Sequence, residues 1–400
     1  MRLERNEHID RLLARHPDVR LVEGASGNGA LIRANQLVAV AGSAEVVHDR
    51  ARRWIDRRED DDAGVAVFHL RPGLDVDECD IAVGLSEGAA HKRVNAGPNH
   101  IVTAQPDWHP GPFDDPEPAD AIPAPSESTE STVQSDVTVA ILDTGIAKHP
   151  WFDNRKWFAV CDSDVFEVPD ADDNDRLDSV AGHGTFIAGV VLQQAPEAHL
   201  LIDRIISGDG VTDEHRLVRG LARLRARAGK ANRRVDVVSL SLGCYTHDDK
   251  PSPVVEHAIN AFDRHTVVVA CAGNAGSDRP FWPAALKRVI AVASLDEDAN
   301  DRAPFSNYGW WVDACTLGEK VTSSFFSYTD HTMSGVEQFG GYASWSGTSF
   351  AAPRVAGAIA AKAAADGSSA SAAASAVIDP NTARSMPDLG VLVDVPSSRG

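Results

Sequence analysis

The chain has 400 residues, of which 43% are hydrophobic, and chains above about 250–300 residues usually divide into more than one folded unit. Its formal net charge of −20 repels phosphate backbones and anionic lipid, so no nucleic acid and no membrane is expected among its partners. The five cysteines are far apart and odd in number, which fits neither a disulfide framework nor a CxxC metal site.

The N-terminal residues 1–20 are charged throughout and lack the apolar stretch of a secretory signal. No later run reaches the roughly 20 apolar residues that a membrane-spanning helix needs. The alanine-rich stretch after Pro353 comes nearest, but Arg354 and Lys362 interrupt it, and a buried core helix explains it better. The sequence therefore predicts a cytoplasmic protein.

Residues 1–106 show the mixed pattern of a small α+β domain. The apolar runs at residues 36–42, 64–71 and 100–106 are predicted as strands, and residues 43–58 as a helix. We therefore expect a first folded unit that ends near residue 106.

A segment rich in Pro, Ser, Asp and Glu follows, over residues 107–135. Such a composition cannot bury enough apolar surface to order itself. We predict an exposed, flexible linker here, and a second folded unit over residues 136–400.

Apolar strand-like runs alternate with helical segments in this second unit. The alternation predicts an α/β fold with a mostly parallel central sheet. In such sheets active sites form at the carboxyl ends of the strands, so polar side chains at those points mark the candidate site. The predicted strands are residues 137–143, 200–205, 235–243, 266–274 and 289–294, and an amphipathic helix is predicted over residues 215–229.

Three polar residues stand at points where chemistry is expected. Asp143 ends the first of these strands, and His183 lies between glycines at the start of an apolar helix. Ser349 opens a helix of small residues, where backbone N–H groups and the helix dipole favour negative charge. Taken singly, His183 could be structural and Ser349 a helix cap. Taken together, a serine, a base and a carboxylate are the parts of nucleophilic serine catalysis.

The order of these motifs resembles that of the subtilisin-like serine peptidases. The resemblance covers most of residues 137–365 and implies a subtilisin-like three-layer fold and hydrolysis of peptide bonds. It rests first on Asp143-Thr144-Gly145, His183-Gly184-Thr185 and Gly347-Thr348-Ser349. Further matching segments, in the family's order, are Ser241-Leu242-Gly243, Ala272-Gly273-Asn274, Pro283-Ala284 and Phe305-Ser306-Asn307-Tyr308-Gly309.

The resemblance also implies a role for each matching residue. Ser349 would be the nucleophile, His183 the general base and then acid, and Asp143 the residue that fixes the His183 tautomer. Asn274 would donate its amide to the oxyanion, together with the Ser349 N–H. The family's substrate-binding segments match Ser241, Leu242 and Gly243, where a peptide would add as an extra strand, and Ala270, Cys271, Ala272 and Gly273, which would line the primary specificity pocket.

Several positions depart from the family pattern. Phe350 and Arg354 stand where Met and His are usual, and Cys271 replaces a small apolar residue beside the predicted pocket. Residues 325–344, rich in aromatic and polar groups, precede the nucleophile motif. These departures bear on specificity and leave the expected reaction unchanged.

Residues 162–178 are strongly acidic, with Arg176 as their only basic residue. The family often binds calcium in surface loops through oxygen ligands. This segment has no EF-hand spacing, however, and a solvated loop explains it better. Structural calcium is compatible with the family, but no metal site and no catalytic cofactor is predicted.

Two alternatives to the peptidase stay open. A catalytically inactive protein with the same fold would bind peptides without cutting them. Acid-acting peptidases that use Ser, Glu and Asp share the Gly-Thr-Ser motif, although the intact His183 motif argues against them. Residues 1–106 would be either a prodomain that blocks the cleft or a module that recruits substrates, and their size and position favour the prodomain. The expected partner is a protein or peptide substrate.

Overall fold

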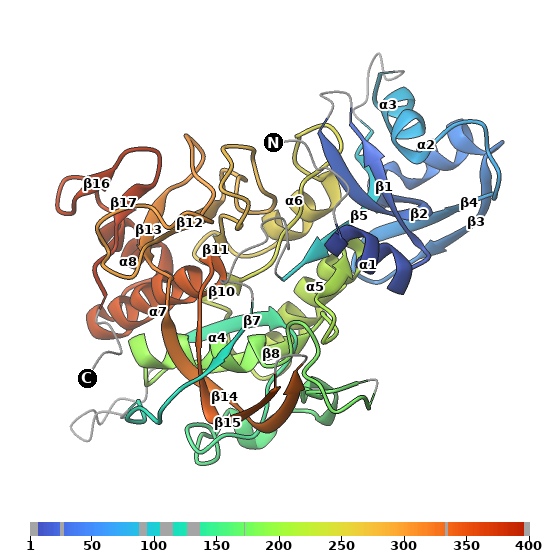
Figure 1. Cartoon of the computed structure of the whole chain (residues 1–400). Coiled ribbons are helices and arrows are strands. Elements are labelled where there is room, and N and C mark those ends of the chain that lie inside the picture. Colours follow the sequence, from blue (N-terminus) through green and yellow to red (C-terminus); the bar gives the residue numbers. More distant parts are fainter. Residues whose placement is uncertain are drawn as a thin grey trace. The chain divides into compact units, whose positions relative to one another are not determined.

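Figure 1 shows the computed structural model of the chain, which forms two compact units. The described residues are 7–24, 28–87, 94–104, 115–125, 137–171, 173–332 and 335–395. The first unit comprises Met1–Val102, Thr212–Arg223 and Cys244–Phe262, and the second comprises Thr103–Val211, Leu224–Gly243 and Asp263–Gly400.

The first unit is built on one sheet whose strand pairs β1–β2, β2–β4, β2–β5 and β3–β4 are antiparallel. Its elements are α1 (Glu7–Arg15), β1 (Val19–Glu23), β2 (Gly29–Val40), α2 (Ala41–Ala51), β3 (Ile55–Asp60), β4 (Val65–Leu70), α3 (Glu78–Glu87), β5 (Ala96–Thr103), β9 (Val211–Asp213) and α6 (Pro253–Asn260). The strand order is β3-β4-β2-β5-β9, with β1 beside β2. Helices α2 and α3 pack on β2 and enclose a core that includes Leu37, Val47, Phe68 and Ile81.

The helix predicted over residues 43–58 is shorter than expected. Helix α2 ends at Ala51, and a turn closed by the Trp54 N–H on the Ala51 carbonyl (2.8 Å) leads into β3. This is an edge strand with exposed charged side chains, such as Arg57 and Glu59, and its half-buried Arg58 pairs with Glu45 at 2.6 Å. Charged residues are typical both of an edge strand and of the polar face of a helix, so the pattern did not distinguish the two.

The boundary of the first unit also differs from the predicted 1–106, because segments from the middle of the chain belong to it. Arg33 on β2 pairs with Asp213 at 3.0 Å, and His215 Nε2 lies 2.7 Å from Asp61 Oδ2. Sequence periodicity reports on neighbours along the chain and does not reveal such long-range pairs.

A buried cluster of two histidines and a carboxylate lies in the same unit. His100 Nδ1 is 3.0 Å from Glu214 Oε1, and its Nε2 is 3.1 Å from Nδ1 of His247. The three residues are 3%, 1% and 7% exposed, respectively. Burial, followed by the neighbouring charge of His100, lowers the pKa of His247 to about 4. The cluster therefore favours a neutral His247.

The second unit contains the mostly parallel sheet that the sequence predicts. Its strands are β7 (Thr138–Asp143), β8 (His199–Arg204), β10 (Val237–Leu240), β11 (Val267–Cys271), β12 (Val289–Leu295), β13 (Ala314–Leu317), β16 (Ser385–Met386) and β17 (Gly390–Leu392). They follow the order β16-β17-β13-β12-β11-β10-β7-β8, and β16–β17 is the antiparallel pair. Every residue of β7, β10 and β11 is buried, as expected for parallel strands covered on both faces.

Helices α4 (His183–Gln194) and α7 (Thr348–Asp366) pack together and against this sheet, α4 on β7 and α7 on β10 to β13. Small residues allow their close approach, because a Cβ at Gly357 would lie 2.7 Å from Cβ of Gln194. The alanine-rich stretch is thus a core helix. Among the described residues no helix is long and apolar enough to span a bilayer. The remaining helical elements are η1 (Phe158–Val160), η2 (Ser163–Val165), α5 (Glu214–Lys230) and α8 (Ala370–Val377).

A separate three-stranded sheet uses part of the predicted linker. Strands β14 (Val321–Thr332) and β15 (Gly335–Trp345) form an antiparallel hairpin, and β6 (Glu117–Pro118) pairs with β15. Backbone pairing needs no apolar side chains, so a polar segment can still contribute a short edge strand. The rest of the predicted linker, residues 107–114 and 126–135, lies outside the described residues.

Candidate active site

Asp143 lies at the carboxyl end of β7, in the interior of the large sheet. Its Oδ1 atom accepts hydrogen bonds from the Thr144 N–H (2.8 Å) and from Nδ1 of His183 (2.7 Å). Gly145 has a φ of 116°, and a Cβ there would lie 2.3 Å from the carbonyl oxygen of Val165. Only glycine fits this turn, which directs the chain away from the carboxylate.

His183 is the first residue of α4 and is completely buried. A carboxylate only accepts hydrogen bonds, so Nδ1 carries the proton donated to Asp143 and Nε2 is left as the acceptor. Within the described part of the chain, Nε2 has no hydrogen-bond partner. The ring is held by Trp345 and Phe350, whose ring centroids lie 5.5 and 5.4 Å away. One ring nitrogen is thus fixed and the other is available to accept a proton.

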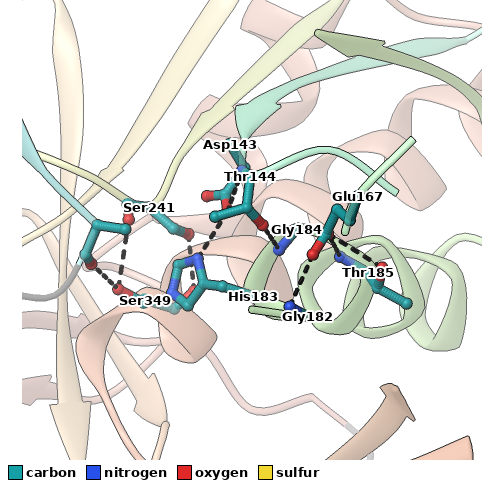
Figure 2. A network of polar contacts seen from close by, with 10 residues as sticks. Asp143, Thr144, Glu167, Gly182, His183, Gly184, Thr185, Ser241 and Ser349 are labelled. Carbon is teal, nitrogen blue, oxygen red and sulfur yellow. Dashed lines mark hydrogen bonds and ion pairs between the residues drawn. The ribbon is translucent and has the colours of Figure 1, made fainter. Parts of the chain in front are cut away.

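Ser349 is the second residue of α7, and in Figure 2 the His183 ring lies between it and Asp143. Its Oγ is within hydrogen-bond distance of the carbonyl oxygens of Ala104 (3.2 Å) and Ser241 (3.4 Å), not of His183. The Ser241 hydroxyl in turn donates to the Ser349 carbonyl at 2.7 Å. The structure therefore brings the three predicted residues together, with the serine hydroxyl directed at backbone carbonyls.

Asn274 lies at the opening of the same helix. Its Oδ1 accepts hydrogen bonds from the backbone N–H (2.9 Å) and the hydroxyl (2.7 Å) of Thr348. These two donors fix which end of the amide is oxygen. The Nδ2 group faces the turn at Gly347, where a Cβ would lie 3.4 Å from it. An N–H donor is thus held beside the first turn of α7.

The predicted substrate-binding segment Ser241–Gly243 pairs with a segment of the chain itself. Thr103 and Gly243 exchange two backbone hydrogen bonds, each 3.0 Å long, as an antiparallel bridge. The Ala104 N–H donates to the carbonyl of Gly210 at 3.3 Å. Residues 103 and 104 therefore lie as an extended strand against Gly243 and Gly210. Sequence reasoning missed Gly210, whose signal was the glycine-rich turn after the strand at residues 200–205.

The four predicted pocket residues, Ala270, Cys271, Ala272 and Gly273, run from the end of β11 toward Asn274 and are buried. The Ser349 and Thr348 side chains beside the Cys271 thiol lower its pKa, but burial has the larger, opposite effect. Burial raises the pKa of Cys271 to about 12. Because the thiolate is the reactive form, this cysteine is inert near neutral pH.

Glu167 joins the segments on either side of His183 and was missed by sequence reasoning, which grouped it with a solvated acidic loop. Its Oε2 accepts the Gly182 N–H (2.7 Å), and its Oε1 accepts the N–H (3.0 Å) and hydroxyl (3.1 Å) of Thr185 (Figure 2). Burial of the carboxyl group raises the pKa of Glu167 to about 7. The available signal was the apolar neighbours Phe166 and Val168 within an otherwise acidic run.

The rest of the described acidic segment forms hydrogen bonds within itself and with β14, where Asp330 Oδ1 accepts the Leu177 N–H at 3.0 Å. Asp170 accepts hydrogen bonds from the N–H groups of Asn174 (3.1 Å) and Asp175 (2.8 Å). Among the residues that the structure describes, no three His, Cys, Asp or Glu side chains are grouped so as to hold a metal ion.

Comparison with known proteins gives consistent matches to one family. The model of the subtilase family matches residues 134–391. Subtilisin BL of Lederbergia lenta is 32% identical over 249 residues, which cover 60% of this chain and 80% of the relative. Thermitase of Thermoactinomyces vulgaris is 32% identical over 235 residues, covering 56% and 73%. The major intracellular serine protease of Bacillus subtilis strain 168 is 29% identical over 261 residues, covering 61% and 74%.

Solved structures share the fold at low sequence identity. Fervidolysin from Fervidobacterium pennivorans, a keratinolytic enzyme related to subtilisin, matches with a TM-score of 0.57 and 17% identity, over 91% of this chain and 60% of its own. A lanthipeptide protease matches with a TM-score of 0.51 and 22% identity, over 65% of this chain and 86% of its own. The α/β fold with a mostly parallel sheet is thereby confirmed.

Proposed function

The chain belongs to the subtilase family of serine peptidases, and from this premise we propose that Asp143, His183 and Ser349 are its catalytic triad. The observation that carries the proposal is the 2.7 Å hydrogen bond between Asp143 Oδ1 and His183 Nδ1, made by two fully buried side chains. It selects the tautomer whose Nε2 can accept a proton. The proposed activity is that of a serine endopeptidase on proteins or peptides.

In the proposed acylation step, His183 Nε2 takes the hydroxyl proton as Ser349 Oγ bonds to the carbonyl carbon of the substrate. The tetrahedral intermediate then collapses, the C–N bond breaks, and His183 returns the proton to the leaving amine. In deacylation His183 Nε2 takes a proton from water as the water oxygen bonds to the acyl carbon, and it gives that proton to Ser349 Oγ as the C–O bond to the serine breaks. Asp143 keeps its hydrogen bond from His183 Nδ1 and stabilises the imidazolium that forms in each half-reaction.

The oxyanion is proposed to lie between Asn274 Nδ2 and the backbone N–H of Ser349. Ser349 is the second residue of α7, and the first N–H groups of a helix have no partner within it. The Asn274 amide is already oriented by Thr348. Neither donor therefore has to reorganise as negative charge develops.

Catalysis also requires a change at Ser349, whose hydroxyl now contacts the carbonyls of Ala104 and Ser241. Rotation about χ1 carries Oγ between staggered positions and brings it toward His183 Nε2. The alternative of an inactive peptide-binding protein gains no support, because the nucleophile, the base, the orienting carboxylate and the amide donor are all present.

The test is covalent labelling with a fluorophosphonate, combined with cleavage of casein. We expect wild type to be labelled at Ser349, and Ser349→Ala to lose the label and about 10⁶-fold in kcat. Ser346→Ala is the matched control, because that hydroxyl accepts the Lys320 N–H and has no proposed part in the reaction. Casein cleavage by Ser349→Ala at the wild-type rate would refute the triad.

A further inference from the structure

The Phe281 side chain contacts both segments that are expected to bind substrate. A Cβ built on Gly243 would lie 2.3 Å from Cε1 of Phe281, and a Cβ built on Gly273 would lie 3.1 Å from its Cδ1 and Cγ atoms. The ring is 1% exposed. It therefore lies directly against the backbones of Gly243 and Gly273.

The register of the sheet places these two glycines level with each other on neighbouring segments. Leu240 and Ala270 are the last paired residues of β10 and β11. Gly243 and Gly273 each stand three residues beyond that pair, on segments that no longer bond to each other as strands. Phe281 contacts both, so its ring occupies the space between the two segments.

A bound peptide would send a side chain into this same space. Thr103 shows that an extended chain adds to Gly243 through two backbone hydrogen bonds. The other segment leads to Asn274, where the carbonyl under attack would be polarised. A peptide that meets both conditions directs the side chain next to its scissile carbonyl between the two segments.

The walls of this space are held in place, which limits how far they can part. Asn307 donates from Nδ2 to the carbonyl of Ala272 (2.8 Å), and its Oδ1 accepts from Ala275 and Ser277 (3.0 Å each). The backbone of Phe281 is tied by its carbonyl to the Ala285 N–H at 2.9 Å. Forcing extra volume into such packing is costly.

We propose that Phe281 fills the primary specificity pocket, so that the residue on the acyl side of the scissile bond must be small, namely Gly, Ala or Ser. The inference rests on the proposed endopeptidase activity and names the substrate class of that site. Large aromatic or branched side chains at that position would have to displace the Phe281 ring.

The experiment compares peptide 4-nitroanilides that differ only in the acyl-side residue, Ala, Leu or Phe, using the full chain after any self-cleavage has gone to completion. For wild type we expect kcat/KM to be about 10²-fold higher for Ala than for Phe. Equal or greater kcat/KM for Phe would overturn the pocket proposal without any variant, and would leave the peptidase assignment standing.

Removal of the ring should reverse this preference. In Phe281→Ala we expect kcat/KM for the Phe and Leu substrates to rise more than tenfold relative to the Ala substrate. Phe281→Leu keeps more of the packing, so it should change the ratio of these kcat/KM values in the same direction but by less. Phe152→Ala is the matched control, because it removes a fully buried ring elsewhere in the unit and should leave the ratio unchanged.

The outcomes separate the two proposals. If Phe281→Ala and Phe281→Leu cleave with the wild-type ratio, the pocket proposal is wrong. If no nitroanilide is cut and Ser349 does not react with a fluorophosphonate, the peptidase assignment fails and the pocket proposal falls with it.

Discussion

The Asn274 amide is oriented by its oxygen, not by its nitrogen. Thr348 donates both of its hydrogen bonds to Oδ1. The Nδ2 group can therefore donate a hydrogen bond to the oxyanion as negative charge develops on it. A donor that acts mainly in the transition state affects kcat and not substrate affinity. The effect of a substitution on kcat therefore distinguishes an amide that acts in the reaction from one that only stabilises the start of α7.

Two different substitutions at Asn274 should therefore lower kcat to a similar extent. Asn274→Leu removes both functions of the amide, and Asn274→Asp keeps the acceptor for Thr348 while removing the donor. We expect each to lower kcat by about 10²–10³-fold with little change in KM, as measured by steady-state kinetics on one peptide substrate. Near wild-type kcat in Asn274→Asp would mean that Asn274 serves only to hold Thr348.

Glu167 illustrates how a single buried carboxyl group joins separate loops. It accepts hydrogen bonds from Gly182 and Thr185 on either side of His183, and its Cγ lies 3.0 Å from a Cβ built on Gly145. Its pKa is raised from 4.5 to about 7, chiefly by burial. The folded protein therefore holds this proton more tightly than the unfolded chain does.

The stability linked to Glu167 should fall as pH rises. The contribution is fully present below the unfolded pKa of 4.5 and is lost through about pH 7. The glutamine side chain of Glu167→Gln cannot ionise. As pH rises through this window, the free energy of unfolding of the parent should therefore fall by up to about 3 kcal/mol relative to that of Glu167→Gln. Denaturant titrations in a Ser349→Ala background measure the difference without self-digestion. The exposed Asp164→Asn is the control, and a Glu167→Gln difference that is flat with pH would contradict the prediction.

At the scale of elements, the parallel sheet could be predicted because its strands are covered on both faces. Runs such as residues 137–143 and 266–274 are apolar except for one threonine and the polar residue that ends each run, and this pattern can be recognised without knowing which segments neighbour it. The polar residue that ends each run then marks the site. The chain order of Asp143, His183 and Ser349 added the family resemblance.

The elements and residues that the sequence missed depend on contacts between distant segments. Residues 55–58 of strand β3 were predicted as the end of a helix because their charges fit both structures. Glu167 stands in a run of acidic residues, and only the fold shows that its carboxyl group is buried. Phe281 is one of 13 phenylalanines, and its role follows from its contacts with Gly243 and Gly273.

The junction of β5, α5 and the segment before α6 provides a prediction at this scale. The pKa of His247 is lowered from 6.5 to about 4 by burial and by His100, with Asp77, Asp248 and Lys250 as the other charged groups around it. A depressed histidine pKa stabilises the fold above the unfolded value, and the contribution is lost as pH falls from about 6.5 to 4.

Substitution of His247 should remove that dependence. In a Ser349→Ala background, the parent should lose up to about 3 kcal/mol relative to His247→Asn as pH falls through this window, measured by denaturant unfolding. The exposed His331→Asn serves as the control and should track the parent. If the free energy of unfolding depends on pH in the same way in the parent and in His247→Asn, the histidine cluster is not the cause of the loss of stability at acid pH.

At the scale of the whole molecule, the strand beside Ser349 belongs to the protein itself. Residues 103 and 104 bond to Gly243 and Gly210, where the proposed function would place a substrate, and residues 1–102 precede them. This arrangement favours the prodomain hypothesis for the N-terminal region over the recruiting module. The sequence that follows is rich in Pro, Ser, Asp and Glu, a composition typical of connections in which cleavage requires little unfolding.

We therefore predict that the enzyme cuts its own chain between about Val102 and Ser135. Intact-mass analysis should find two fragments in wild type and one full-length chain in Ser349→Ala. The N-terminal fragment should co-elute with the remainder near neutral pH, because residues 212–223 and 244–262 belong to its folded unit. A fully active wild type that stays uncut would instead support the recruiting module.

The covalent continuity between that strand and Ser349 also determines the kinetic order of activation. An intramolecular encounter has an effective concentration fixed by the fold, so diluting the protein does not slow it. The half-time of self-cleavage should therefore be the same at low and at high protein concentration. The rate of activation would then be first order, and the activation barrier of the first self-cleavage would set it.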